Sequence, residues 1–186
     1  KFKIEFISSG GTFKEIKKLG FKCLEVSQYT GSPEILDGRV KTLHPKVHAG
    51  ILSKRNKKSH IKDLKKNNFS EIDLVVVNFY PFEKTLENTN NHEKIIENID
   101  VGGPAMVRGA AKNYNDVTVI TNSDQYIELI NELKKNYGST SLDFRKKMSE
   151  IAFAETAYYD ALISNYLNLK SKNFFPKKKN NFWKFN

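Results

Sequence analysis

The sequence has few cysteines and no long apolar run. Cys23 is the single cysteine among 186 residues, so no internal disulfide can form, and a reducing compartment is the simpler interpretation. No apolar stretch approaches the roughly 18 residues that a membrane helix needs, and residues 1–4 lack a signal-peptide pattern. The sequence therefore predicts a cytoplasmic protein without a membrane partner.

The composition is that of a folded domain with an uneven charge. Hydrophobic residues make up 39% and aromatic residues 12%, which is enough for one packed core. The net charge is +10, but residues 170–186 hold six lysines and no acidic residue, so the rest carries only +4. Because no nucleic-acid motif occurs before this tail, the tail is interpreted as a solvated linker, and no nucleic-acid partner is expected. A body of charge +4 suits a small anionic substrate.

Apolar patterning predicts alternating strands and helices. Strands are expected over 2–7, 22–26, 74–79 and 117–120, the third as a buried parallel strand. Helices are expected over 12–20, 57–67, 93–99, 103–114, 123–137 and 142–167. Residues 27–56 and 84–92 are predicted to be mostly loop. This order predicts an α/β fold: a three-layer arrangement of a parallel sheet with helices on both faces.

A glycine-containing turn, Ser9-Gly10-Gly11-Thr12, lies between the first strand and its helix. Glycines let the backbone approach a ligand closely, and the free N–H groups of a helix start attract an anion such as a phosphate. The alternative is local, because Thr12 and Glu15 also have the spacing of a capping box. The residues alone leave both interpretations open.

Three further segments carry groups suited to chemistry. Residues 39–48 hold several cations and two imidazoles, which could bind a phosphate and move protons or could form a solvated basic loop. His44 and His48 make a weak zinc pattern without nearby partner ligands, so no metal is predicted. Tyr80 follows the buried strand, where parallel sheets bind ligands, or it packs at the sheet edge. Asp100 could cap the helix that follows it, and Lys112 could be an ordinary surface lysine.

Three long motifs occur together and in order. They are Asn78-Phe79-Tyr80-Pro81-Phe82, the run from Asp37 to Leu52 containing Arg39-Val40-Lys41-Thr42-Leu43-His44-Pro45, and the run from Asn98 to Asn113 containing Asp100-Val101-Gly102-Gly103-Pro104. Over residues 2–168 the chain closely resembles the inosine-monophosphate (IMP) cyclohydrolase domain of the bifunctional purine biosynthesis (PurH) family, which has a methylglyoxal-synthase-like fold.

The resemblance implies an activity and a set of site residues. The family's domain closes the ring of 5-formamidoimidazole-4-carboxamide ribonucleotide to IMP, the last step of de novo purine synthesis, with no metal or organic cofactor. The matched catalytic positions are Lys41, Tyr80, Asp100 and Lys112. The matched positions at the nucleotide phosphate are Ser9, Gly11, Thr12, Arg39, Lys41 and Thr42. A regulatory, ligand-binding domain of the same fold is the alternative function.

The resemblance also sets the domain limits. Residues 1–168 match the cyclohydrolase domain, and residues 169–186 match a basic linker toward a formyltransferase (AICAR transformylase) domain that the chain does not include. The family protein is expected to be a homodimer. Its central first strand lies upstream of residue 1, so residues 2–7 and 74–79 should be separated by a gap or paired directly. A chain without this strand is expected to be of low stability and inactive.

Overall fold

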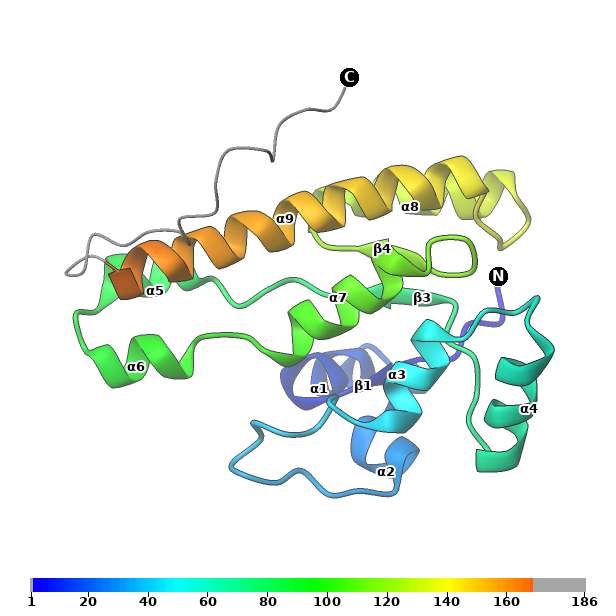
Figure 1. Ribbon diagram of the computed structural model, residues 1–186, viewed down its shortest axis with the longest axis horizontal. Coiled ribbons are helices and arrows are strands. Elements are labelled where there is room, and N and C mark those ends of the chain that lie inside the picture. Colours follow the sequence, from blue (N-terminus) through cyan, green and yellow to red (C-terminus); the bar gives the residue numbers. More distant parts are fainter. Residues whose placement is uncertain (1, 169–186) are drawn as a thin grey trace, which may run out of the picture. The chain divides into compact units, whose positions relative to one another are not determined.

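The computed structural model describes residues 2–168, which form short strands among longer helices (Figure 1). The elements in order are β1 (Ile7–Ser8), α1 (Gly10–Lys18), β2 (Leu24–Glu25), α2 (Val26–Thr30), α3 (Pro45–Leu52), α4 (Lys58–Asn67), β3 (Leu74–Val76), α5 (Phe82–Asn88), α6 (His92–Glu97), α7 (Gly102–Lys112), β4 (Thr118–Ile120), the 3-10 turn η1 (Ser123–Gln125), α8 (Tyr126–Lys135) and α9 (Leu142–Asn168). The described residues divide into a larger unit, 2–80 with 100–156, and a smaller unit, 81–99 with 157–168. Among residues 2–168 no helix is both long and apolar enough to cross a membrane.

The strands form two separate parallel pairs. β1 pairs with β2, with Ile7 opposite Leu24, and β3 pairs with β4, with Val75 opposite Val119. Within the described chain no ladder joins one pair to the other. The predicted interruption between the two pairs is therefore confirmed, and the alternative of direct pairing is wrong. All four strands are shorter than predicted, and the expected low stability of the chain stays a prediction.

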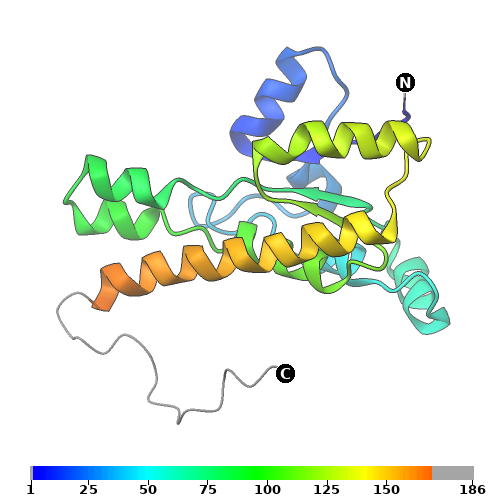
Figure 2. The same cartoon turned by 90° about the horizontal axis from the view of Figure 1, so that it is seen from above.

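Helices cover both faces of β3 and β4. Figure 2 shows α8 on one side of these strands and α7 on the other. Val119 and Ile120 are buried at 1% and 0% exposure, and Val107 of α7 and Met148 of α9 belong to the same core. Apolar side chains on successive strand residues are buried on both faces only when helices cover both faces. The predicted layered α/β architecture is thus confirmed.

Two segments predicted as loops contain helices. α2 and α3 lie within residues 26–52, where glycines and prolines had favoured loop. Pro45 is the first residue of α3, a position that needs no backbone N–H, and His44 caps it, so the proline begins the helix. α5 covers residues 84–88 of the segment 84–92. Phe82 is its buried residue, so the rest of this helix can be polar.

The apolar faces of α1 and α8 differ from those predicted. Tyr126 and Ile130 were expected to face the core, but Ile130 is 48% exposed, and Leu129 is buried instead. Asn122, not Ser123, caps the start of this segment through the 3-10 turn. Leu19, predicted on the buried face of α1, is 70% exposed. Short helices with apolar residues on several sides do not define one face by spacing alone.

Polar side chains link segments of the larger unit to one another by donating hydrogen bonds to backbone carbonyls. Asn113, directly after α7, donates its side-chain amide to the carbonyls of Ile51 and Ser53 at 2.9 and 3.0 Å. Arg145 of α9 donates to the carbonyls of Tyr114 and Asn115, both at 2.8 Å. These bonds satisfy carbonyls in the last turn of α3 and just beyond the ends of α3 and α7, which would otherwise lack donors.

The smaller unit has a core of its own. Phe82, Ile95 and Tyr159 are 1%, 2% and 5% exposed, and the rings of Phe82 and Tyr159 meet edge to face at 6.2 Å. Tyr158 donates its hydroxyl to Glu83 at 2.6 Å. The expectation that residues 170–186 pack little against the body falls outside the described residues.

Candidate active site

The start of α1 is an open helix terminus. Ser9 is its N-cap, with extended backbone and no side-chain capping bond, and Gly10 has φ of +55°. The helix begins at Gly10, so Thr12 lies inside the first turn and the predicted capping box of Thr12 and Glu15 is wrong. No acidic residue occurs in this first turn. The N–H groups here are therefore able to bind an anion, as the phosphate interpretation requires.

A tight turn brings Lys41 to this helix start. Ile35 and Val40 form an antiparallel bridge, and Leu36 and Asp37 both have positive φ in the turn between them. A Cβ atom built on Gly10 would lie 3.9 Å from the Lys41 ammonium nitrogen, so this lysine is next to α1. Arg39, the other predicted phosphate ligand of this turn, is exposed. The structure thus joins two segments that were separately predicted to bind a phosphate.

Asp100 lies at the start of α7, near Lys41. Its Oδ1 accepts a hydrogen bond of 2.8 Å from the backbone N–H of Gly103, so the predicted capping role is confirmed. Burial raises the pKa of the Asp100 carboxyl, and the Gly103 hydrogen bond and the Lys41 charge offset part of this effect. A carboxyl group with a raised pKa beside an ammonium group is suited to proton transfer.

Thr42 contacts the same end of α7. A Cβ atom built on Gly102 would lie 2.6 Å from the Thr42 hydroxyl, closer than real Cβ contacts, so a side chain at position 102 would force a displacement. Glycine at this position allows the close approach. We call Gly10, Lys41, Thr42, Asp100 and Gly102 the Lys41–Asp100 cluster.

Glu34 adjoins this cluster and was not predicted. Its carboxylate lies 4.0 Å from the Lys41 ammonium, and the two side chains are 41% and 25% exposed. Gly38 lies between them in the turn, because a Cβ there would meet Glu34 at 3.4 Å and Lys41 at 3.8 Å. Six residues of irregular loop separate Glu34 from Lys41 in the chain, so no periodic pattern in the sequence points to this ion pair.

Tyr80 and Lys112, the other two predicted catalytic residues, are both exposed. Tyr80 follows β3 and is 48% exposed. Lys112 is exposed at the last position of α7, about 15 Å along the helix axis from Gly102. Arg108, one turn before Lys112, lies over the ring of Phe153 in α9. Neither the Tyr80 nor the Lys112 side chain makes a hydrogen bond or ion pair within residues 2–168, so the catalytic roles of these two residues stay predictions.

The two histidines of residues 39–48 have structural surroundings. The Nδ1 of His44 accepts a hydrogen bond of 3.1 Å from the N–H of Lys46 and caps α3. The Nε2 of His48 is buried without a hydrogen-bond partner in the described chain, and burial lowers the pKa of this imidazole. In the part of the chain that the structure describes, no group of three or more His, Cys, Asp or Glu residues is placed to hold a metal ion.

Comparison with known proteins agrees with this architecture. Residues 1–105 match the MGS-like domain family, and residues 110–185 match the AICARFT/IMPCHase bienzyme family. The bifunctional purine biosynthesis protein PurH of Bradyrhizobium diazoefficiens is 50% identical over 165 residues, 89% of this chain and 31% of that protein. The PurH protein of Prochlorococcus marinus strain NATL2A is 54% identical over 167 residues, 89% of this chain and 32% of that protein.

These relatives are longer than the chain, which spans about a third of their length. Among solved structures, the crystal structure of ForH superimposes with a TM-score of 0.75 at 30% identity, covering 87% of this chain and 84% of ForH. More than half of the chain matches the MGS-like domain, and its parallel strands with helices on both sides fit that match. The chain therefore belongs to the MGS-like domain family and shares about half of its residues with PurH proteins over nine tenths of its length.

Proposed function

We propose that this chain carries an IMP cyclohydrolase activity, the dehydrative ring closure of 5-formamidoimidazole-4-carboxamide ribonucleotide. The observation that supports this most directly is the Lys41–Asp100 cluster, because one lysine lies both beside an open helix terminus and near a carboxyl group of raised pKa. The identity to PurH proteins supports the choice of substrate.

The chemistry makes modest demands on the protein. The carboxamide nitrogen attacks the formyl carbon, one C–N bond forms, and the formyl oxygen leaves as water after the two nitrogens have each given up a proton. Both reacting groups are attached to one ring, so the enzyme mainly orients them and moves protons.

The cluster and the residues next to it have proposed parts in this reaction. The helix start at Ser9, Gly11 and Thr12, with Arg39 and Thr42, binds the nucleotide phosphate. Lys41 bridges the phosphate and the reacting end of the substrate. Asp100 takes up and returns protons at the carboxamide and the leaving oxygen.

Tyr80 and Lys112 complete the proposal by the family resemblance alone. Tyr80 would orient the formyl group, and Lys112 would share the proton transfers with Asp100. Since Lys112 is at the far end of α7, its participation requires either a substrate that extends along this helix or a second copy of the chain. The homodimer, the accompanying formyltransferase activity and the cytoplasmic location are further parts of this proposal.

The test is the ultraviolet spectrum on mixing protein with the formamido nucleotide. Ring closure changes the absorbance of the base, whereas binding alone does not. The 186-residue chain and a version extended to the full length of its PurH relatives are compared, each with a Lys41→Met variant as control. Turnover in the extended protein that is lost in the variant is expected. Saturable binding without any spectral change would favour the regulatory, ligand-binding alternative.

A further inference from the structure

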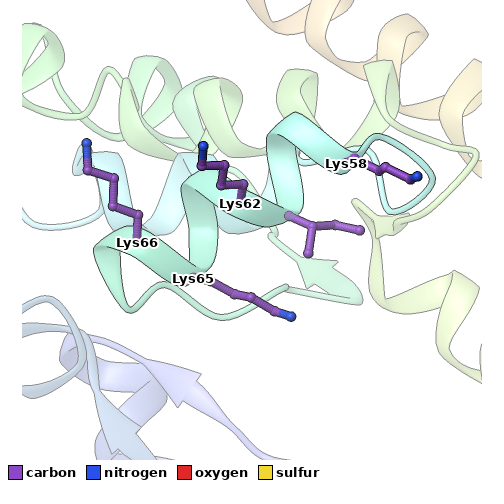
Figure 3. A pocket seen from close by; sticks show the side chains of 5 residues that line it. Lys58, Lys62, Lys65 and Lys66 are labelled. Carbon is purple, nitrogen blue, oxygen red and sulfur yellow. The ribbon is translucent and has the colours of Figure 1, made fainter.

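The exposed face of α4 concentrates lysines. Lys58, Lys62, Lys65 and Lys66 line one open hollow together with Ile61 (Figure 3). The four lysines are exposed, and their side chains extend away from the helix, with Lys62 and Lys66 side by side. We call these four residues the α4 lysine face.

The positive charge of the folded body is concentrated here. Residues 54–66 contain seven lysines and arginines and one acidic residue, Asp63, for a net charge of +6. Residues 1–169 together carry +4, so the remainder of that part has a net charge of −2. The lysine richness of the chain does not produce a uniformly basic surface, because outside this segment and the tail the charges are nearly balanced.

These lysines repel one another and have no acidic partner in the described part of the chain. Lys58 with Lys62, and Lys62 with Lys66, are four residues apart, which places like charges on neighbouring helical turns at a small cost in stability. No ion pair joins any of the four to an acidic side chain within residues 2–168. By contrast, Arg55 just before α4 binds Asp73 at 2.8 Å. A polyanion bound to the face would relieve this repulsion.

We propose that the α4 lysine face binds the phosphodiester backbone of double-stranded nucleic acid. From Lys58 to Lys66 the helix rises about 12 Å. A duplex carries one phosphate per about 1.7 Å of its axis when both strands are counted, so a face of this length can offer each of the four lysines a phosphate. Lysines contact such a line of charges as flexible point charges, without the fixed geometry that base recognition requires.

Other polyanionic surfaces fit less well. A membrane-surface helix inserts an apolar face into lipid, but Leu64 of α4 is 7% exposed and Ile61 is the one apolar residue lining the hollow. No aromatic ring lines the hollow, so base stacking with single strands has no platform there. An acidic protein partner would need carboxylates at a matching spacing. A nucleic-acid backbone carries regularly spaced negative charges in every sequence, because each nucleotide has a phosphate.

This inference departs from the expectation drawn from sequence motifs. That expectation depended on the absence of a nucleic-acid motif before the tail, and it considered the lysines of the tail alone. A contact made only with phosphates needs no base-reading motif. The α4 lysine face is a candidate because its lysines are grouped in three dimensions and have no acidic partner among residues 2–168.

The test measures binding of the 186-residue chain to a fluorescein-labelled 20-base-pair DNA duplex by anisotropy between 50 and 200 mM salt. The test variant replaces the four lysines by Gln at positions 58, 62, 65 and 66. The matched control replaces four tail lysines, Lys177, Lys178, Lys179 and Lys184, by Gln. Far-ultraviolet circular dichroism compares the folding of all three proteins, and the single substitution Lys62→Glu serves as a milder second variant.

We expect the α4 variant to bind at least tenfold more weakly at 50 mM salt. The slope of log affinity against log salt should become shallower by about 3.6, because each lost phosphate contact contributes about 0.9. Lys62→Glu should weaken binding at least threefold, and the tail control should change it less than threefold. Unchanged binding by the α4 variant, or loss only in the tail control, would overturn the proposal. Equally tight, α4-dependent binding of polyglutamate or of phosphatidylserine vesicles would also overturn it, in favour of a protein or membrane partner.

Discussion

The two strand pairs of the larger unit differ sharply in how they are packed. Ile120 of β4 is fully buried, whereas Ile7 of β1 is 38% exposed and Leu24 of β2 is 42% exposed. The pair β3–β4 is covered on both faces by α7, α8 and α9, and the pair β1–β2 leaves apolar side chains open to solvent. We infer that the β3–β4 pair supplies most of the stability of the unit. The β1–β2 pair mainly positions α1, which begins directly after β1.

The Lys41–Asp100 cluster draws on both regions. Gly10 follows β1 in the open region, and Asp100 precedes α7, which packs against β3 and β4. Catalytic groups commonly lie on loops held by a rigid scaffold. Here the scaffold is asymmetric, since Gly10 directly follows a strand of the exposed pair and Asp100 precedes a helix of the well-packed one.

The largest expected effect is on turnover. In the active protein, Asp100→Ala and Lys112→Ala should each lower the rate of ring closure by at least 100-fold, because each removes a proposed proton carrier. The free energy of unfolding should change little in Lys112→Ala, and by about 1 kcal/mol in Asp100→Ala, because that variant loses a helix cap. Steady-state kinetics and thermal melts check this, and a near-wild-type rate in either variant removes that residue from the mechanism.

The packing contrast itself can be tested with one type of substitution. Ile120→Ala should destabilise the protein by about 3–4 kcal/mol, because it leaves a cavity among fully buried neighbours. Ile7→Ala should cost less than about 1 kcal/mol, because its side chain is already partly exposed. Urea unfolding of both variants measures the difference. Equal losses would mean that the β1–β2 pair is packed as firmly as the β3–β4 pair.

Gly102 of the cluster and Gly11, next to Gly10 of the cluster, provide a smaller contrast. Gly102→Ala should destabilise the protein by about 1–2 kcal/mol and weaken nucleotide binding, because its Cβ would displace Thr42. Gly11→Ala should be neutral or slightly stabilising, since no described atom lies within 4 Å of a Cβ built there. Thermal melts with and without nucleotide compare the two. Equal tolerance of both substitutions would argue against a close approach of Thr42 to α7.

The smallest effect concerns pH and His48. Because burial lowers the pKa of His48 in the folded protein, the unfolded chain binds this proton more readily. Stability is therefore expected to fall as the pH drops below about 6.5, the ordinary pKa of histidine, and His48→Gln should make the decline shallower. The raised pKa of Asp100 acts with the opposite sign, at lower pH. Urea midpoints of both proteins between pH 5 and 7.5 test this, and parallel curves would contradict it.

Sequence patterns predicted the strands better than the helices around the site. Leu74 to Val77 is a continuous apolar run, and such a run has few alternatives to a buried strand. In residues 27–56 glycine and proline suggested loop, but Pro45 begins α3, because proline is well suited to the first turn of a helix. Leu19 and Ile130 were assigned to buried faces by spacing, although spacing does not show which neighbours are present to cover them.

The candidate site was predicted in part. Lys41 lies next to Gly10, which stands between two predicted phosphate positions in the chain, whereas the close approach of Thr42 to Gly102 was not predicted. The ion pair of Lys41 with Glu34 could not be predicted from the sequence, because it depends on the path of an irregular turn. Lys112 is far from Gly102 because α7 has eleven residues and the two lie at its opposite ends. Matching motifs in the sequence did not show this separation.

The buried amide of Asn113 affects how a saturation mutagenesis experiment on this chain would be interpreted. Its two hydrogen bonds to the carbonyls of Ile51 and Ser53 would be lost in Asn113→Ala, leaving buried acceptors unpaired at a cost of about 1–3 kcal/mol. Lys112, the adjacent residue, is exposed, and its substitution should leave folding intact. Low fitness at both codons would therefore have different origins, loss of protein at 113 and loss of catalysis at 112. An abundance measurement beside the activity measurement would separate the two positions.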